Sequence, residues 1–176
     1  MTGDRNLRAV HIGLSVGHAG SFDDSKPRLI HDFRSLDGVD VVAYCEIYDS
    51  SYLDEARKHH PDANLYSSVE ELIAKEDFDL ACVVLLPRDI PEVLLKLADA
   101  GKHFMVDKQF ARSSQELQEV VKSVRRNEVT TFLAYPVRFH PAMQDLRKMI
   151  DDGVMGDPMF VAVSYTHLTL PTILLV

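Results

Sequence analysis

The sequence predicts an α/β fold in which a doubly wound parallel sheet carries helices on both faces. Two observations support this prediction. Short apolar runs bounded by turn residues alternate with segments whose apolar residues recur at helical spacing. A strand followed by a helix, repeated several times, is the order that builds a parallel sheet through right-handed crossovers. The 176 residues are enough for one domain with a substantial core and too few for two.

Five short apolar runs are the expected strands. Each is bounded by turn residues and is shorter than an ordinary helix. Near-continuous apolar character is typical of parallel strands that are buried on both faces. The runs cover residues 9–13, 39–45, 80–86, 104–106 and 131–134.

The intervening segments predict helices. In residues 91–100 and 116–126 the apolar side chains fall on one helical face. Gly101 stands where a helix C-cap belongs, so the first of these helices should end just before it. Two serine–glutamate pairs have the capping-box spacing and predict helix starts just before residues 69 and 115. These pairs are Ser67 with Glu70 and Ser113 with Glu116.

The composition narrows the class of partner. A formal net charge of -8 argues against a nucleic acid, because phosphate binding needs a basic face, and favours a small molecule. Cys45 and Cys82 lie in apolar runs, so we expect buried thiols rather than a disulfide framework. No signal peptide or membrane-spanning run is present in the sequence, which predicts a cytoplasmic protein. No two histidines stand at i and i+4 together with an acid, as a helix-borne zinc site needs, so we expect no metal.

The first predicted strand leads into a glycine-rich turn at residues 13–20, followed by a helix expected to begin near residues 25–27. Such a turn can cradle a pyrophosphate, because glycine lets the backbone approach the phosphates and a helix N-terminus supplies free amides. Ser15 stands where the second glycine of the usual motif belongs, and Gly17 falls one position early, so a plain turn is the alternative. The candidate cofactor-binding residues are Gly13, Ser15, Val16, Gly17 and His18.

Glu46 directly follows the second predicted strand. An acid at this position can accept hydrogen bonds from both ribose hydroxyls of an adenosine, so Glu46 is the predicted ribose ligand. Its charge would repel a 2′-phosphate, which favours NAD over NADP, although a nearby arginine would reverse that preference. The alternative is a solvated loop carboxylate.

Several further segments occur in a characteristic order. They are Ser67-Ser68-Val69-Glu70-Glu71-Leu72, a strand after Asp79 that ends in Leu86-Pro87, Ala100-Gly101-Lys102-His103, Asp107-Lys108, and Tyr135 with Arg138-Phe139-His140-Pro141. Taken in series over residues 8–160, these segments resemble the N-terminal NAD(P)-binding Rossmann domain of the Gfo/Idh/MocA oxidoreductases, the glucose-fructose oxidoreductase and inositol dehydrogenase family.

The resemblance implies a role for the acid–lysine pair at the end of the fourth predicted strand. The family usually has Glu-Lys-Pro there, with the lysine beside the nicotinamide and the substrate hydroxyl. Lys108 is therefore the implied catalytic residue, which polarises the substrate oxygen, and Asp107 its orienting neighbour. Gln109 replaces the proline, so we expect a trans peptide and a slight displacement of Lys108. Judged without the rest of the chain, a surface Asp-Lys dipeptide is the alternative.

Three more cofactor contacts are implied by the resemblance. Leu86 and Pro87 end the third predicted strand, and Arg138 belongs to a stretch that lies near the nicotinamide in the family. For Arg138, packing as a cap on the next helix is the alternative.

The resemblance also divides the chain. Residues 1–135 are the expected Rossmann domain, and residues 136–163 the start of a truncated substrate domain whose first strand would occupy residues 157–163. Residues 164–176 are an expected non-native tail. Residues 163–172 match one translated frame of a transposon-type sequencing adapter, although a natural short tail is the alternative.

The implied function of the intact parent is NAD(P)-dependent hydride transfer to or from a secondary alcohol of a sugar, polyol or related small substrate. The alternatives are a non-catalytic dinucleotide-binding regulatory module and an NAD-dependent glycoside-cleaving relative. We expect a homo-oligomer at full length and no nucleic-acid or membrane partner. The chain as it stands is expected to bind cofactor weakly, to be inactive alone, and to associate through an exposed strand at residues 159–163.

Overall fold

The structure is a computed structural model that describes residues 5–16, 22, 34–160 and 162. The chain divides into two compact units, Met1–Ala134 and Tyr135–Val176, and each is described by itself. The helix expected near residues 25–27 and the tail at residues 164–176 lie outside the described residues.

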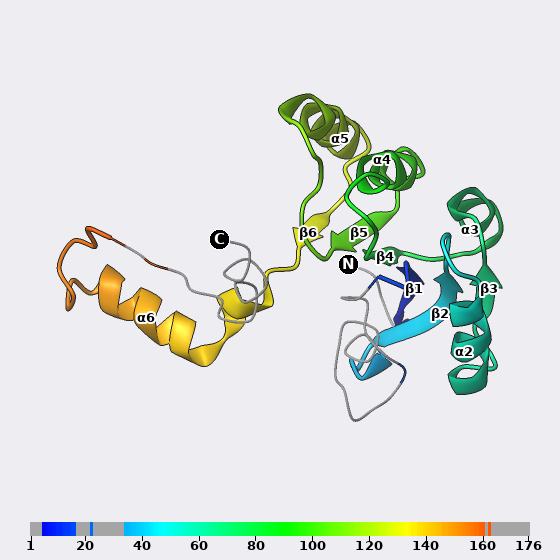
Figure 1. Cartoon of the computed structure of the whole chain (residues 1–176), viewed down its shortest axis with the longest axis horizontal. Coiled ribbons are helices and arrows are strands. Elements are labelled where there is room, and N and C mark those ends of the chain that lie inside the picture. The colour runs from blue at the N-terminus through cyan, green and yellow to red at the C-terminus, as the bar shows by residue number, and fades with distance from the viewer. Residues whose placement is uncertain (1–4, 17–21, 23–33, 161, 163–176) are drawn as a thin grey trace, which may run out of the picture. The chain divides into compact units, whose positions relative to one another are not determined.

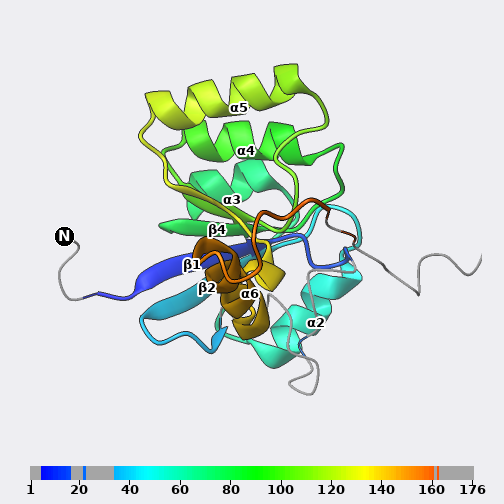
Figure 2. The ribbon, with the colours of Figure 1, turned by 90° about the vertical axis from the view of Figure 1, so that its left-hand side faces the viewer.

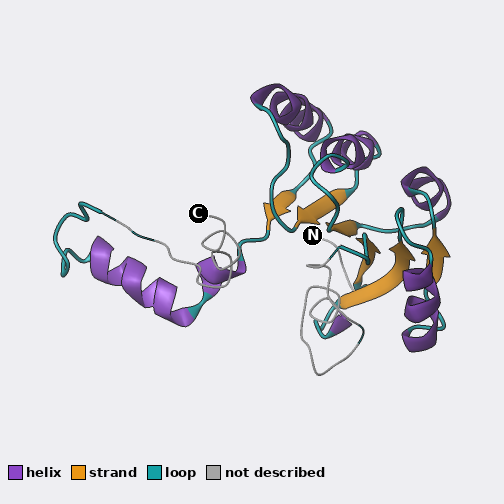
Figure 3. Ribbon diagram, in the orientation of Figure 1, coloured by secondary structure: helices purple, strands orange, loops and turns teal. Residues whose placement is uncertain are grey.

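The first unit is built on a six-stranded parallel sheet with the order β3-β2-β1-β4-β5-β6 (Figure 1; strands in orange in Figure 3). This order confirms the predicted doubly wound α/β fold. The chain direction across the sheet reverses between β1 and β4, which is the topological switch point where such folds bind ligands. The strands are β1 (Leu7–Ile12), β2 (Val39–Cys45), β3 (Asn64–Tyr66), β4 (Leu80–Val83), β5 (His103–Val106) and β6 (Thr131–Leu133).

The observed strands differ from the predicted ones in two places, a missed strand and a wrong strand end. β3 was not predicted, because its three residues carry no run of apolar side chains and its pairing with Ala43–Cys45 of β2 is a tertiary contact. β4 ends at Val83 instead of Leu86. Its neighbour β1 ends at Ile12, which is in register with Val83, so residues 84–86 have no β1 residues beside them to pair with in a ladder. These three apolar residues line a pocket instead.

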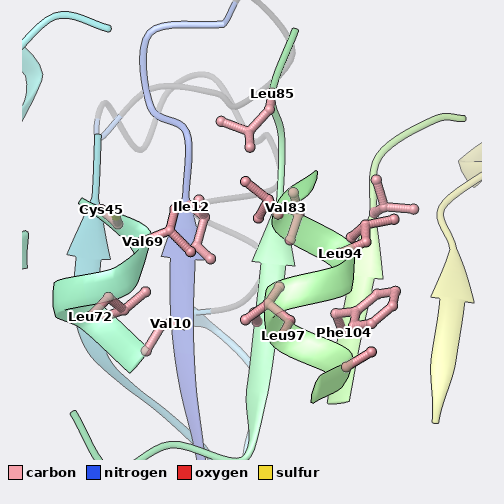
Figure 4. Close-up of a cluster of buried hydrophobic side chains, with 14 of the residues drawn as sticks. Val10, Ile12, Cys45, Val69, Leu72, Val83, Leu85, Leu94, Leu97 and Phe104 are labelled. Carbon is pink, nitrogen blue, oxygen red and sulfur yellow. The ribbon is translucent and has the colours of Figure 1, made fainter. Parts of the chain in front are cut away.

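Helices cover both faces of the sheet, as predicted. Figure 2 shows α3 (Val69–Lys75), α4 (Ile90–Asp99) and α5 (Ser114–Arg126) on one side and α2 (Ser51–His59) on the other. The first face holds the larger apolar cluster, in which Leu72, Leu94 and Leu97 pack on β-strand residues such as Val10 and Val83 (Figure 4). Burial of this apolar surface is the main stabilising contribution to the unit.

Cys45 and Cys82 are buried and carry free thiols, as expected from the sequence. Burial raises the pKa of the Cys45 thiol to about 12 and also raises that of Cys82, so both thiols stay protonated and behave as apolar side chains.

The helix ends follow from local hydrogen bonds. Gly101 has a φ of 68° and closes α4 with a Schellman motif, in which the amides of Gly101 and Lys102 donate to the carbonyls of Ala98 and Leu97. Ser113 caps α5 as predicted, since its hydroxyl accepts from the Glu116 amide.

The cap of α3 is a correction. The hydroxyl that accepts there belongs to Ser68, from the Glu71 amide, and not to Ser67. Both serines stand three residues before a glutamate, so spacing alone could not separate them.

The second unit contains a 3₁₀ helix, η1 (Pro136–Phe139), and α6 (Pro141–Asp151). The strand predicted at residues 157–163 is absent among residues 157–160 and at 162, which are the described part of that segment. A strand is held by hydrogen bonds to a neighbouring strand, and the described residues offer this segment none. Met159 and Phe160 are 98% and 86% exposed. Within the described part of the chain, no helix is long and apolar enough to cross a membrane.

His11 is a polar side chain buried in the core without a hydrogen bond from its ring among the described residues. The side chain lies on β1, is 1% exposed, and neither ring nitrogen has a hydrogen-bond partner among the described residues. Burial lowers the pKa of His11 from 6.5 to about 4, and the Glu46 carboxylate opposes that shift only in part.

We expect stability to fall as the pH falls from 6.5 to 4. The folded chain binds a proton at His11 more weakly than the unfolded chain does. The stability that the neutral His11 contributes is therefore complete above pH 6.5 and is lost as the pH falls toward the folded-state pKa of about 4. The loss should be about 3 kcal/mol in the free energy of unfolding. Urea unfolding of wild-type and His11→Leu protein at both pH values measures it. An unchanged pH dependence in His11→Leu would show that another group is responsible.

Gly13 ends β1 in a conformation that a side chain cannot adopt. Its φ is 90°, and a Cβ there would lie 1.9 Å from the Val84 carbonyl oxygen. We expect Gly13→Ala to destabilise the chain by about 3 kcal/mol or more beyond a matched control, because the steric contact adds to a backbone strain that the control shares.

The control is Gly38→Ala. Gly38 has a φ of 82°, but a Cβ there meets no described atom within 4 Å, so only the backbone term of about 1 kcal/mol applies. Urea midpoints compare the two variants, and equal losses would contradict the steric argument.

Candidate functional site

The carboxyl ends of three strands meet at the centre of the sheet. Ile12 of β1 is in register with Cys45 of β2 on one side and with Val83 of β4 on the other. Beyond these residues the loops remain tied together, since the amide of Gly13 donates to the Cys45 carbonyl at 2.8 Å and that of Val84 donates to the Ile12 carbonyl at 2.8 Å. The predicted glycine turn, Glu46 and the Leu86–Pro87 segment therefore emerge side by side.

Glu46 holds the glycine turn through its carboxylate. Oε2 accepts from the amides of Leu14 at 2.6 Å and Ser15 at 2.8 Å. Oε1 accepts from the Ser15 hydroxyl at 3.0 Å and from the amides of Tyr48 at 2.7 Å and Asp49 at 3.3 Å. These bonds offset the desolvation of a charge that is only 2% exposed.

This burial excludes the alternative of a solvated loop carboxylate. It also adds a feature that was not predicted, because the oxygens expected to receive ribose hydroxyls already receive protein donors.

Tyr48 joins the loop after β2 to the loop after β4. Its hydroxyl donates to Asp89 Oδ2 at 2.6 Å and accepts from the Leu86 amide at 3.0 Å. Partial burial, followed by the hydrogen bond to Asp89, raises the pKa of Tyr48 to about 12, so the hydroxyl keeps its proton and can act as the donor. Neither Tyr48 nor Asp89 was predicted as part of the site, because the two residues are 41 positions apart and leave no local pattern to detect.

A pocket of about 320 Å³ opens between the glycine turn and the ends of β4 and β5. This volume lies at the lower end of the range for small-molecule sites. The residues of the predicted site that the structure brings together here are Val16, Leu86, Pro87, Asp107 and Lys108. The wall is completed by apolar residues and by one more polar side chain, namely Val83, Val84, Leu85, Ile90 and Gln109.

The acid–lysine pair follows β5 directly. The Asp107 amide donates to the Val83 carbonyl at 3.0 Å, which holds this loop against β4. Asp107 is half-buried, while Lys108 and Gln109 are exposed at the edge of the pocket. The described residues contain no cis peptide bond, so the Lys108–Gln109 bond is trans as expected. An ammonium group at this position can donate to an oxygen held in the pocket.

Gly13, Ser15 and Glu46 lie at the carboxyl ends of β1 and β2 but do not line this pocket.

Three other predicted site residues cannot be placed at the carboxyl edge of the sheet. Gly17 and His18 lie outside the described residues. Arg138 is an exposed residue of η1 in the second unit. The side chain that caps α6 is His140, whose Nδ1 accepts from the Ala142 amide at 3.3 Å, and not Arg138. Among the described residues there is no group of three or more His, Cys, Asp or Glu that could hold a metal ion.

Comparison with known proteins places these features in a family. Residues 12–135 match the Gfo/Idh/MocA family model, described as an oxidoreductase family with an NAD-binding Rossmann fold. The chain is 25% identical over 136 residues to D-apiose dehydrogenase of Paraburkholderia graminis, which covers 77% of this chain and 36% of the relative.

Two solved structures share the fold. One is myo-inositol 2-dehydrogenase from Lactobacillus plantarum, with a TM-score of 0.73 and 21% identity, covering 87% of this chain and 43% of that one. The other is the WlbA dehydrogenase of Bordetella pertussis in complex with NADH and UDP-GlcNAcA, with a TM-score of 0.72 and 19% identity. This match covers 86% of this chain and 44% of that one. The chain thus spans less than half the length of each relative. The match over most of the chain shows that it belongs to the Gfo/Idh/MocA oxidoreductase family and carries that family's NAD-binding Rossmann fold.

Proposed function

We propose that this chain supplies the NAD-binding half of a dehydrogenase that acts on a secondary alcohol of a sugar, polyol or related small molecule. The observation that carries the proposal is the convergence of the glycine turn, the Leu86–Pro87 loop and the Asp107–Lys108 pair on one pocket at the switch point of the sheet. The names of relatives, which include a D-apiose and an inositol dehydrogenase, support the substrate class.

The residues fit a nicotinamide at the pocket. Val84, Leu85 and Ile90 offer an apolar surface to a flat ring, and Asp107, Lys108 and Gln109 supply the polar groups of the lining. NAD supplies the hydride acceptor when it is bound. Lys108 would hydrogen-bond the substrate oxygen and assist movement of its proton, and Asp107 would orient the ammonium group.

Glu46 is the proposed ribose ligand at the adenosine end. It lies at the end of β2 beside the glycine turn, where an acid can reach both ribose hydroxyls. A buried carboxylate there would repel a 2′-phosphate, which supports NAD over NADP. Arg88 is close by but pairs with Asp89 at 3.3 Å, which reduces its attraction for that phosphate.

Titration calorimetry with NAD and NADP tests the cofactor assignment. We expect wild-type protein to bind NAD more tightly, and Glu46→Gln to lower the ratio of the NADP Kd to the NAD Kd by roughly tenfold, because the repelling charge is removed. The ratio is informative because loss of folded protein affects both Kd values equally. Glu119→Gln, an exposed position on α5, is the matched control and should leave the ratio unchanged. Failure of wild-type protein to bind either dinucleotide would refute the proposal.

We expect the 176-residue chain to bind NAD without turning over a substrate. Pro87, Lys108 and Gln109 on the pocket wall are exposed, and a substrate needs a closed, oriented and water-poor site. Assays with inositol and aldoses, followed at the NADH absorbance, measure this. Turnover that Lys108→Met abolishes would show that the single Rossmann unit is sufficient for catalysis.

A second candidate function is a non-catalytic dinucleotide-binding module. The observation that favours it is the engagement of Glu46 by protein donors, together with serine in place of the second glycine. A parent protein extended to the length of its relatives distinguishes the two: NAD binding without dehydrogenase activity on any polyol would support the module. An NAD-dependent glycoside-cleaving enzyme would share this site and would be recognised by its products.

A further inference from the structure

We propose that the Ser15 hydroxyl is a built-in competitor of the adenosine ribose for Glu46, and that Ser15 thereby sets the affinity for the dinucleotide. The inference rests on the proposed function, since it concerns the ribose contact of that same site. The side chain concerned is a serine at a position where the usual phosphate-binding turn has glycine.

The geometry shows which bond can be exchanged. Glu46 accepts from four backbone amides, those of Leu14, Ser15, Tyr48 and Asp49. These amides are fixed by the turns that carry them. Among the described donors to this carboxylate, the Ser15 hydroxyl is the one that belongs to a side chain. Rotation about a single χ1 bond removes it from Oε1 without any movement of the backbone.

Burial makes the exchange necessary. Glu46 is 2% exposed, so a ribose hydroxyl cannot reach the carboxylate while the surrounding groups keep their positions. Ser15 is only half-buried, so its hydroxyl can leave Glu46 and be satisfied by water. A ribose hydroxyl would then occupy the acceptor site that Ser15 leaves.

The exchange has a definite cost. A hydrogen bond from a hydroxyl to a carboxylate is stronger than one between neutral groups, so breaking it opposes binding. The Ser15→Ala substitution would remove the competing hydroxyl donor. It would keep the Cβ and the backbone amide, which still donates to Glu46 Oε2. We therefore expect Ser15→Ala to bind NAD roughly fivefold to tenfold more tightly than wild type.

Calorimetry on the full 176-residue chain tests the inference with three ligands: NAD, ADP and a dideoxyribose analogue of ADP. The gain in Ser15→Ala should appear with NAD and ADP, which both carry the adenosine ribose hydroxyls, and should vanish with the analogue, which has none. Ser15→Thr keeps a hydroxyl on the same Cβ and should stay within about twofold of wild type. Thermal unfolding of each variant checks that the folded fraction is the same.

The outcomes separate the two proposals. If wild-type protein binds NAD and Ser15→Ala binds it no more tightly, the competition is refuted and the cofactor assignment stands. An equal gain with the dideoxy analogue would also refute it, because the gain would not arise at the ribose. If the wild-type chain binds neither NAD nor ADP, the proposed function fails, and the inference fails with it.

Discussion

The buried carboxylate of Glu46 is the interaction on which the carboxyl edge of this domain depends. A charge that is 2% exposed is tolerated only when hydrogen-bond donors replace the lost water, and here backbone amides from two different loops do so. The loop after β1 and the loop after β2 are therefore fixed to one point. Any ligand that enters at this edge meets a turn whose amides are already oriented.

Two other contacts extend this arrangement across the switch point. Gly13 lets the chain leave β1 so close to β4 that a Cβ would lie 1.9 Å from the Val84 carbonyl oxygen. Tyr48 then reaches from the β2 loop to the Leu86 amide and to Asp89 at the start of α4. Together these contacts join the loops after β1, β2 and β4, although each loop comes from a different part of the chain. The edge is thus held both by the ends of the sheet and by hydrogen bonds between the loops.

The carboxyl edge of the sheet has to bind a ligand under the proposed function and also hold its own loops in place. Glu46, the proposed ribose ligand, also anchors the turn beside it, so the proposed role would compete with the anchoring role for the same oxygens. At the end of β5, the Asp107 amide holds this loop against β4, while Lys108 is exposed on the wall of the pocket. Under the proposed function, such a domain presents a cofactor platform, and the chain spans less than half the length of its relatives.

Local and repetitive features were determined by the sequence alone. The parallel α/β class, the buried cysteines, the Ser113 cap and the Gly101 helix end all depend on periodicity or on residues a few positions apart. The glycine turn and the family resemblance together named five of the residues that line the pocket, namely Val16, Leu86, Pro87, Asp107 and Lys108. The tertiary structure decided what depends on distant partners: that β3 is a strand, that β4 stops at Val83, that Ser68 rather than Ser67 caps α3, and that Tyr48 reaches Asp89. It alone revealed that Glu46 is already bonded, because a carboxylate in a sequence carries no record of which donors the fold will bring to it.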